Sequence, residues 1–293
     1  MALTCSLVSN VSDVAHVTFQ RVAYTPVFIL GLVLNASALW CFTRIPQWTE
    51  THIYMLNLLL ADLLLTLFLP VRIFETYCPM SPGMFCTFLI CVHYCNMYVS
   101  IFTITAISIH RYVAVMFPMQ KQPSRASEAR RKKIASGTCA FIWLAVITIC
   151  TIFSRNMLPD QLLTCYSRKP YKKMTLAFLL VLEILGYLLP IVIITTCSTQ
   201  AIRTILKSLK KIHQHSEDEI VDSRKSVVAI ITANMIVFMV CFTPIHLGYV
   251  FRYIFGHTFH VFYDVAECLA TTNCCLDSVG YYFLLKKIFR DKR

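Results

Sequence analysis

The sequence predicts an all-α membrane protein, a seven-transmembrane helix bundle with a short amphipathic C-terminal helix. Hydrophobic residues make up 57% of the 293 residues and charged residues only 14%, against roughly 25% charged residues in a soluble domain. The apolar residues form seven runs that approach or exceed the ~20 residues needed to cross a bilayer. These runs are apolar on all sides, which favours helices over the alternating strands of a membrane barrel.

The seven predicted spans account for most of the chain and leave short connections between them. The longer spans are expected to tilt or to extend past the lipid as helical ends. No repeat, low-complexity tract or long linker divides the chain, so a single membrane domain is predicted. In order, the spans are residues 22–42, 53–74, 85–115, 134–153, 174–205, 227–255 and 259–283.

Lysine and arginine residues predict the orientation, because positively charged connections stay in the cytoplasm. They gather at Arg44 and within 121–133, 207–225 and 286–293. The formal charge of +12 therefore reports membrane topology, and no nucleic-acid partner is expected.

This orientation divides the chain into three parts. Residues 1–21 are predicted to be extracellular, residues 22–283 to form the seven-helix domain, and residues 284–293 to lie along the cytoplasmic membrane surface as an amphipathic helix, touching membrane lipids. Asn10, in Asn10-Val11-Ser12, matches a glycosylation acceptor pattern that only works in the secretory lumen. We expect a multi-pass plasma-membrane protein with its N terminus outside.

Four of the 14 cysteines are predicted to face the oxidising side, namely Cys5, Cys78, Cys86 and Cys165. Cys86 opens the third span and Cys165 lies in the extracellular loop between the fourth and fifth spans, so a bridge between them would pin that loop over the mouth of the bundle. Cys5 and Cys78 are a weaker candidate pair, since four cysteines allow three connectivities.

Two carboxylates, Asp62 and Asp277, lie within predicted spans, where ionisable residues are costly and are candidates for function. Asparagine and serine oxygens on the third and seventh spans could complete a pocket for a small cation. A proton path and a polar cluster that joins helices are the other interpretations. The candidate ion ligands are Asp62, Asn96, Ser100, Asn273 and Asp277.

Taken together, these features resemble the rhodopsin-like, or class A, G-protein-coupled receptors along almost the whole chain. Within the family, the stretches 47–55 and 273–283 look most like the receptors for kynurenic acid and lysophosphatidylinositol. The residues that carry the family resemblance are Asn35, Asp62, Cys86, Arg111, Trp143, Cys165, Pro190, the stretch Cys241-Phe242-Thr243-Pro244-Ile245-His246, and the stretch from Asn273 to Tyr281.

The resemblance implies a receptor that activates a heterotrimeric G protein when an extracellular ligand shifts the bundle toward an open packing. Pro244 would be the hinge of the sixth helix, and a sodium ion, the one cofactor-like ion expected, would favour the inactive state. The sequence up to Arg293 has no Ser/Thr-rich tail of the kind that receptor kinases phosphorylate, so no prediction is made about arrestin as a partner. The implied activation and coupling residues are His110, Arg111, Tyr112, Phe238, Pro244 and Tyr281.

Two departures from the family pattern concern the inactive state. His110 replaces the acid that usually neutralises Arg111, and Arg224 stands where some members place a carboxylate. Losing an ion pair of the closed state lowers the free-energy difference between the closed and open states, so elevated basal signalling is predicted.

Basic residues on the extracellular half suggest an anionic ligand, because arginine binds carboxylate and phosphate groups in a bidentate manner. Arg72 is the preferred anchor; a small aromatic carboxylic acid and a lysophospholipid both fit. His93 and His246 are equally well explained as packed side chains. The candidate ligand-binding residues are Arg72, His93, Tyr94, Met97, Tyr98, Arg155, Phe242, His246, Tyr249 and Arg252.

A transporter or channel that uses Asp62 and Asp277 is the alternative, although paired broken helices and an internal repeat are missing from the sequence. An enzyme is not expected, because the sequence contains no HExxH, GxSxG or P-loop pattern.

Overall fold

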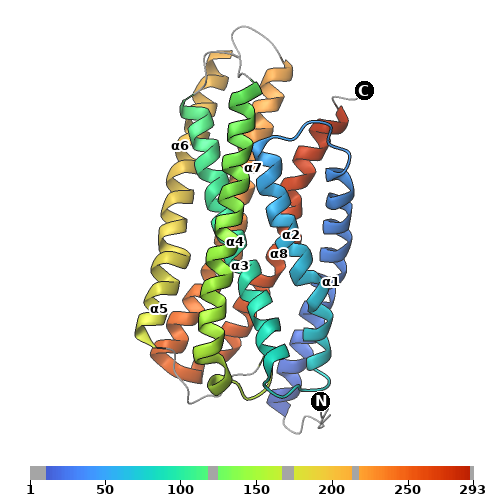
Figure 1. Ribbon diagram of the computed structural model, residues 1–293, viewed down its shortest axis with the longest axis vertical. Coiled ribbons are helices and arrows are strands. Elements are labelled where there is room, and N and C mark those ends of the chain that lie inside the picture. Colours follow the sequence, from blue (N-terminus) through green and yellow to red (C-terminus); the bar gives the residue numbers. More distant parts are fainter. Residues whose placement is uncertain (1–10, 118–124, 167–174, 213–217, 291–293) are drawn as a thin grey trace.

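The computed structural model describes residues 11–117, 125–166, 175–212 and 218–290. Side chains are described for these residues except 11–16, 154–161, 210–220, 222, 223, 257 and 279–290. The helices lie roughly side by side along the long axis of an elongated bundle (Figure 1). They are α1 (Val11–Phe42), α2 (Glu50–Glu75), α3 (Met84–Met116), α4 (Arg125–Gln161), α5 (Leu176–Glu183), the π-helical turn η1 (Ile184–Leu188), α6 (Leu189–Ile212), α7 (Asp218–Phe255), the 3₁₀ turn η2 (Gly256–Phe259) and α8 (His260–Arg290).

The predicted seven-helix bundle is confirmed, with α5, η1 and α6 joined end to end as the fifth span. Among the described residues, six helical stretches are long and apolar enough to cross a membrane, and the seventh predicted span lies in α8. Large apolar side chains such as Trp40, Phe141 and Leu144 cover the outside of the bundle. In water this surface would be costly, whereas in a bilayer it contacts lipid.

Several helices extend past the predicted spans. α1 begins at Val11, within the segment predicted to be extracellular, and α4 begins at Arg125, within the basic connection. α8 continues without a break to Arg290. The helical conformation predicted for residues 284–290 is therefore confirmed, while its position along the membrane surface stays a prediction.

The π-helical turn in the fifth span was not predicted. It ends at Leu188, two residues before Pro190, and the amide of Leu189 donates to the carbonyl of Ile184, five residues earlier. Proline cannot donate its own backbone bond, and a wider turn next to it lets the neighbouring carbonyls find other donors. The wider turn brings Gly186 against the ring of Tyr98 on α3.

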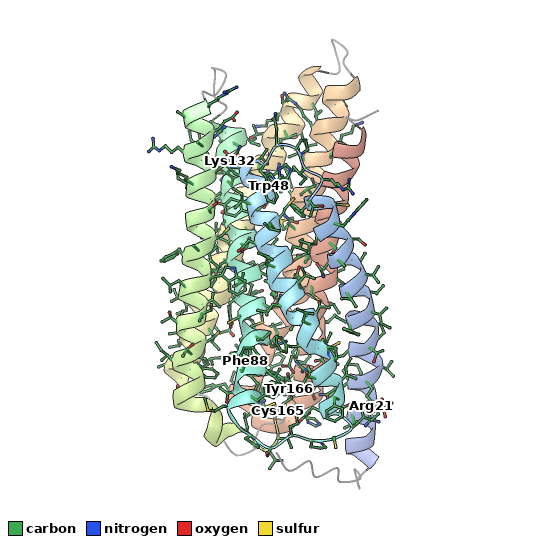
Figure 2. All side chains as sticks on the ribbon, turned by 45° about the vertical axis from the view of Figure 1, so that its right-hand side comes forward. Arg21, Trp48, Phe88, Lys132, Cys165 and Tyr166 are labelled. Atoms are coloured by element: carbon green, nitrogen blue, oxygen red, sulfur yellow. A yellow bond between two sulfur atoms is a disulfide. The ribbon has the colours of Figure 1, made fainter. Side chains whose placement is uncertain are left out.

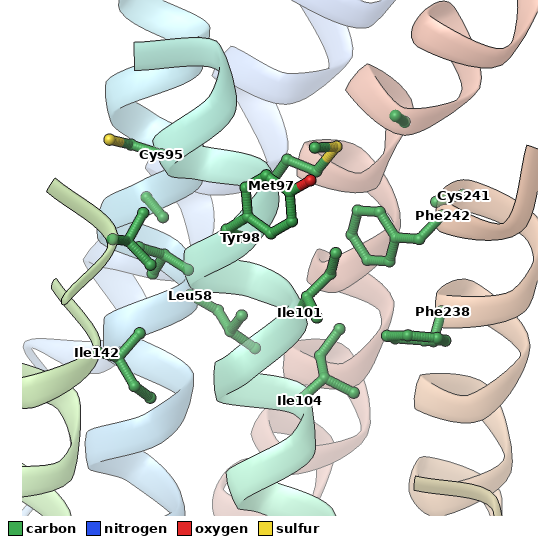
Figure 3. Packing of buried hydrophobic residues seen from close by; sticks show 14 of the residues in the cluster. Leu58, Cys95, Met97, Tyr98, Ile101, Ile104, Ile142, Phe238, Cys241 and Phe242 are labelled. Atoms are coloured by element: carbon green, nitrogen blue, oxygen red, sulfur yellow. The ribbon is translucent and has the colours of Figure 1, made fainter. Parts of the chain in front are cut away.

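α3 is the central helix and contacts α2, α4, α6, α7 and α8. In the middle of the bundle, Ile101 and Ile104 on α3 pack toward Phe238 and Phe242 on α7 (Figure 3). All four side chains are essentially inaccessible to solvent. This core contains Phe238, one of the residues for which a role in activation is predicted.

Polar side chains also join the helices. Asn35 donates to the carbonyl of Cys274 at 2.8 Å, which ties α1 to α8. The indole nitrogen of Trp143 donates to Asn57 at 2.8 Å, which ties α4 to α2. Asparagine and tryptophan within apolar helices thus have structural partners here.

The predicted bridge between Cys86 and Cys165 is present, and we call the end of the bundle that holds it the disulfide end. Figure 2 shows Arg21, Cys165 and Tyr166 at this end and Trp48 and Lys132 at the other, which we call the opposite end. Cys78 is also disulfide-bonded, while Cys5 lies outside the described residues.

Candidate ligand-binding and signalling sites

Arg72 lies near the C-terminal end of α2 and is 4% exposed. Its Nη2 donates to Oε2 of Glu267 on α8 at 2.8 Å. Its Nε and Nη1 are buried and have no hydrogen-bond partner. A buried donor without a partner costs free energy, so this arginine has the capacity to bind one further acceptor group.

Two aromatic rings cover the guanidinium of Arg72. The ring centroid of Tyr24 on α1 lies 4.4 Å from Cζ, and that of Tyr166 lies 4.7 Å away. Such cation–π contacts cover the guanidinium faces and leave its N–H edges for hydrogen bonds. Burial raises the pKa of Tyr166 to about 12, so its hydroxyl is neutral at physiological pH.

The disulfide holds Tyr166 in this position. Cys165, next to it, is bonded to Cys86 at the start of α3, and its amide donates to the carbonyl of Met80 at 3.0 Å. Glu75 on α2 accepts hydrogen bonds from Thr164 and from the backbone of the same loop. The loop therefore lies over Arg72 as a fixed cover.

His93 and Arg252, both predicted to bind ligand, have protein contacts on the same side. His93 Nε2 lies 3.6 Å from Oε1 of Glu267, so one carboxylate contacts α2 and α3. Arg252 lies over the ring of Tyr263, with 5.4 Å from Cζ to the ring centroid. Arg155 is in α4, but its side chain lies outside the described residues.

Carboxylates accompany the described basic residues of the predicted extracellular mouth. Three arginines at the disulfide end accompany four carboxylates, and the strongest predicted anion anchor is already paired. Loop residues 168–173, which carry further basic side chains, lie outside the described part of the chain. The arginines are Arg21, Arg72 and Arg252, and the carboxylates are Glu75, Glu183, Asp264 and Glu267.

His246 on α7 belongs to a second buried polar cluster. Its Nδ1 lies 3.3 Å from Oε1 of Glu183 on α5, and its Nε2 is buried without a hydrogen-bond partner. Its ring stacks on Tyr187 with 4.7 Å between centroids. The hydroxyl of Tyr98 on α3, whose ring lies edge-on to His246, is also buried without a partner.

Sequence reasoning missed Glu183 as a functional candidate. It is a carboxylate within an apolar run, the same signal that singled out Asp62 and Asp277. Glu267, within the predicted span 259–283, carried this signal too. Its contact with Arg72 and the role of Tyr24 had no local signal, because each meets Arg72 only through the packing of helices distant in sequence.

An apolar cavity of about 80 Å³ lies between α3, α4 and the α5–η1 region. Tyr94 and Tyr98 form its inner wall, and Tyr249 on α7 reaches it. Ile149, Val181 and Leu185 line its outer side and are each about half exposed on the lipid-facing surface. The cavity is therefore open toward the bilayer rather than enclosed in the core.

The predicted ligand-binding residues Met97 and Phe242 lie deeper. Both are buried in the central cluster, and the ring of Phe242 packs edge-on against Phe238 at 5.5 Å. Their contacts are those of core side chains that link α3 to α7.

The five predicted cation ligands meet between α2, α3 and α8, and all are buried. Asn96 donates to Oδ1 of Asp62 at 3.1 Å, and Asn273 donates to Oδ2 of Asp277 at 3.0 Å. Three oxygens remain buried without a hydrogen-bond partner: Oδ2 of Asp62, Oγ of Ser100 and Oδ1 of Asn273. Hard oxygen ligands on three helices fit a small cation such as sodium.

At the opposite end, His110 packs against the ring of Tyr54 with 6.0 Å between centroids. Arg111 has a buried Nε without a partner, and within the described residues no carboxylate lies within ion-pair distance of it. Glu50 instead pairs with Arg131 on α4, with Oε1 2.9 Å from Nε. Tyr112, next to Arg111, is partly buried.

α7 carries the remaining activation residues. Arg224, near its start, hydrogen-bonds to Ser208 on α6, and Pro244 lies inside the helix. Tyr281 lies in α8, but its side chain is outside the described residues, and Asn10 lies wholly outside them.

Comparisons with known proteins agree with this arrangement. Residues 34–281 match the family "7 transmembrane receptor (rhodopsin family)". The chain is 31% identical to mouse G-protein coupled receptor 55 over 92% of this chain and 86% of that protein. It is 32% identical to human G-protein coupled receptor 35, over 88% and 81%, and 29% identical to mouse lysophosphatidic acid receptor 4, over 94% and 77%.

The seven-helix bundle, its disulfide and its polar interior define a transmembrane receptor. The chain belongs to the rhodopsin family of seven-transmembrane receptors, whose members bind extracellular ligands and couple to G proteins. The prediction that it is not an enzyme is confirmed. The alternative of a transporter or channel gains no support from this membership.

Proposed function

We propose that this receptor binds an acidic lysophospholipid from outside the cell, with its acidic head group at Arg72, and activates a heterotrimeric G protein. The observation that carries the proposal is the pair of buried, unpartnered N–H groups of Arg72. A phosphate oxygen could accept from either of them, and charge-assisted hydrogen bonds of this kind are strong.

The apolar cavity favours a lipid over a small aromatic acid. Its outer side consists of side chains that face the bilayer, such as Ile149 and Leu185, so a hydrocarbon chain could enter from the membrane. Burying apolar area there contributes about 25 cal/mol per Å². The similarity to lysophosphatidic acid receptor 4, whose name gives its ligand, supports the same class.

The proposed orientation places the disulfide end outside the cell and the protein in the plasma membrane. The basic residues near the helix ends support it, because Arg131 and Lys132 lie at the opposite end, together with Trp48 (Figure 2). In this orientation Asn10 is available for glycosylation, and Arg111 and Tyr281 border the surface that meets the G protein.

Sodium binding is the second part of the proposal. The buried oxygens of Asp62, Ser100 and Asn273 would hold the ion, and Asn96 and Asp277 would complete the pocket. The ion would supply one positive charge next to the two buried carboxyl groups. Opening of the bundle separates the three helices and so lowers sodium affinity.

Binding of a matched panel to the purified receptor in nanodiscs tests the ligand class. The probes are oleoyl-lysophosphatidic acid, oleoyl-lysophosphatidylinositol and kynurenic acid. We expect saturable binding of at least one lysophospholipid. Arg72→Ala should lower the affinity 10-fold or more, because one charge-assisted contact stabilises by about 1.5–3 kcal/mol. Ile149→Phe should also lower the affinity, because it narrows the cavity mouth.

Arg21→Ala is the matched control. Arg21 also lies over a tyrosine, 3.6 Å from the ring centroid of Tyr77, but its Nε and Nη2 already donate to Thr76. Its removal deletes the same charge from the same end of the bundle without removing an unpartnered donor. Binding of kynurenic acid alone, or equal losses for Arg21→Ala and Arg72→Ala, would contradict the proposal.

A further inference from the structure

Glu267 already holds one edge of the arginine to which the ligand is proposed to bind. The ion pair joins α2 to α8, spans 195 residues of sequence, and is largely buried, with side chains 5% and 15% exposed. The second oxygen of Glu267 lies 3.6 Å from His93 on α3. One carboxylate thus connects three helices at the disulfide end.

An acidic ligand and Glu267 would compete for the same positive charge. If an anionic group bound to Nε or Nη1 of Arg72, it would lie on the same guanidinium whose Nη2 donates to Glu267. Two like charges a few ångströms apart repel strongly where water is excluded. The two anions therefore cannot both hold Arg72 at low cost, so binding of one weakens the hold of the other.

We propose that Glu267 is an internal competitor of the ligand, the carboxylate that occupies Arg72 in the ligand-free receptor and that an acidic head group displaces. The displacement step rests on the proposed function, whereas the ligand-free ion pair does not. Glu267 is thus a specificity-determining residue: it sets the affinity threshold that an acid must exceed.

Displacement also has a mechanical consequence. While Glu267 is paired, the outer part of α8 is held to α2 and α3. The same helix carries Asn273 and Asp277 two to three turns further along, where they border the cation pocket. Releasing Glu267 removes this link from α8 to α2 and α3 and favours the rearranged packing that a G protein selects.

The test measures nucleotide exchange on purified G proteins of several classes and binding of oleoyl-lysophosphatidic acid, both with the full chain in nanodiscs. Glu267→Gln keeps the shape of the side chain and removes its charge. We expect at least 3-fold faster ligand-free exchange and about 10-fold tighter lipid binding, a coupling of about 1.4 kcal/mol.

Two further variants separate this role from a general loss of buried charge. Glu75→Gln removes a carboxylate from α2 that bonds to the loop and not to α8, and it should leave ligand-free exchange at the wild-type rate. The charge-swapped double variant Arg72→Glu with Glu267→Arg restores the ion pair and should return ligand-free exchange toward the wild-type rate, although it loses lipid binding.

Unchanged ligand-free exchange in Glu267→Gln, or an equal rise in Glu75→Gln, overturns the inference. Failure of the double variant to reduce the raised exchange overturns it too. If no variant binds the lipid but the exchange rates follow the expected order, the ligand class is wrong and the ligand-free role of Glu267 is supported.

Discussion

Asn96 on α3 donates a hydrogen bond of 3.1 Å to Oδ1 of Asp62 on α2 and leaves Oδ2 of the same carboxylate buried without a partner. Asn273 on α8 has the same form, with its amide nitrogen bonded to Asp277 and its oxygen unpartnered. Each asparagine therefore uses its donor on a carboxylate, and each pair keeps one buried oxygen for a cation, Oδ2 of Asp62 in the first pair and Oδ1 of Asn273 in the second. A cluster that only joined helices would be expected to satisfy these oxygens within the protein.

Sodium should stabilise the receptor, and Asp62→Asn should abolish the effect. A ligand at five times its Kd stabilises the folded state by about 1 kcal/mol, which raises the unfolding midpoint by about 2 °C or more. The measurement compares thermal unfolding in sodium chloride and choline chloride at equal ionic strength. Equal midpoints in the two salts for the wild type would argue against an ion at this site.

His110→Asp should lower ligand-free nucleotide exchange. No carboxylate among the described residues pairs with Arg111, and an aspartate next to it would supply the missing closed-state partner. An ion pair that stabilises the closed state by about 1 kcal/mol would lower the exchange rate roughly 5-fold. His110→Asn, which has nearly the same shape as the aspartate variant and no charge, is the control. Equal exchange in the wild type and the Asp variant would refute the idea.

Gly186→Ala should destabilise the bundle, because an added Cβ would lie 2.7 Å from Cε1 of Tyr98. Overpacking of this kind costs about 1–3 kcal/mol. Gly137→Ala is the matched control, since its Cβ would meet nothing within 4 Å, and alanine favours a helix by up to about 1 kcal/mol. The midpoint of thermal unfolding should therefore fall for Gly186→Ala and rise for Gly137→Ala. Equal shifts in the two variants would show that the Tyr98 contact is unimportant.

Cys86→Ser or Cys165→Ser should destabilise the disulfide end and weaken binding at Arg72. The bridge closes a loop with a sequence separation of 79 residues, for which chain entropy alone gives about 4 kcal/mol. Its loss also releases Tyr166 from the guanidinium. Cys41→Ser, which removes a thiol outside any disulfide, should change neither the unfolding midpoint nor ligand binding.

The bundle could be predicted because hydropathy depends on local sequence and a bilayer demands long apolar helices. The helix ends could not, because polar residues such as those after Arg125 continue a helix beyond the lipid. The π-helical turn before Pro190 could not be predicted from the sequence either. Proline predicts a disturbed helix, but whether the chain kinks or widens depends on neighbours such as Tyr98.

The candidate sites could be predicted where a single residue is energetically costly at its position in the membrane. Asp62 and Asp277 stand out because a carboxylate within a membrane span is costly and is therefore a candidate for function. Arg72 was singled out by its charge, yet its pairing with Glu267 was not, because the partner lies on a helix 195 residues away. Such pairings depend on which helices are neighbours, and spacing within one helix contains no information about that.

Agonist-stimulated nucleotide exchange tests the central claim most directly. The purified receptor in nanodiscs is mixed with purified heterotrimeric G proteins, and exchange is measured with oleoyl-lysophosphatidic acid and oleoyl-lysophosphatidylinositol for the wild type, Arg72→Ala and Arg21→Ala. We expect a lysophospholipid to accelerate exchange in the wild type and in Arg21→Ala, with potency at least 10-fold lower in Arg72→Ala. Equal potency on wild type and Arg72→Ala, or no acceleration with any G protein, would contradict the account.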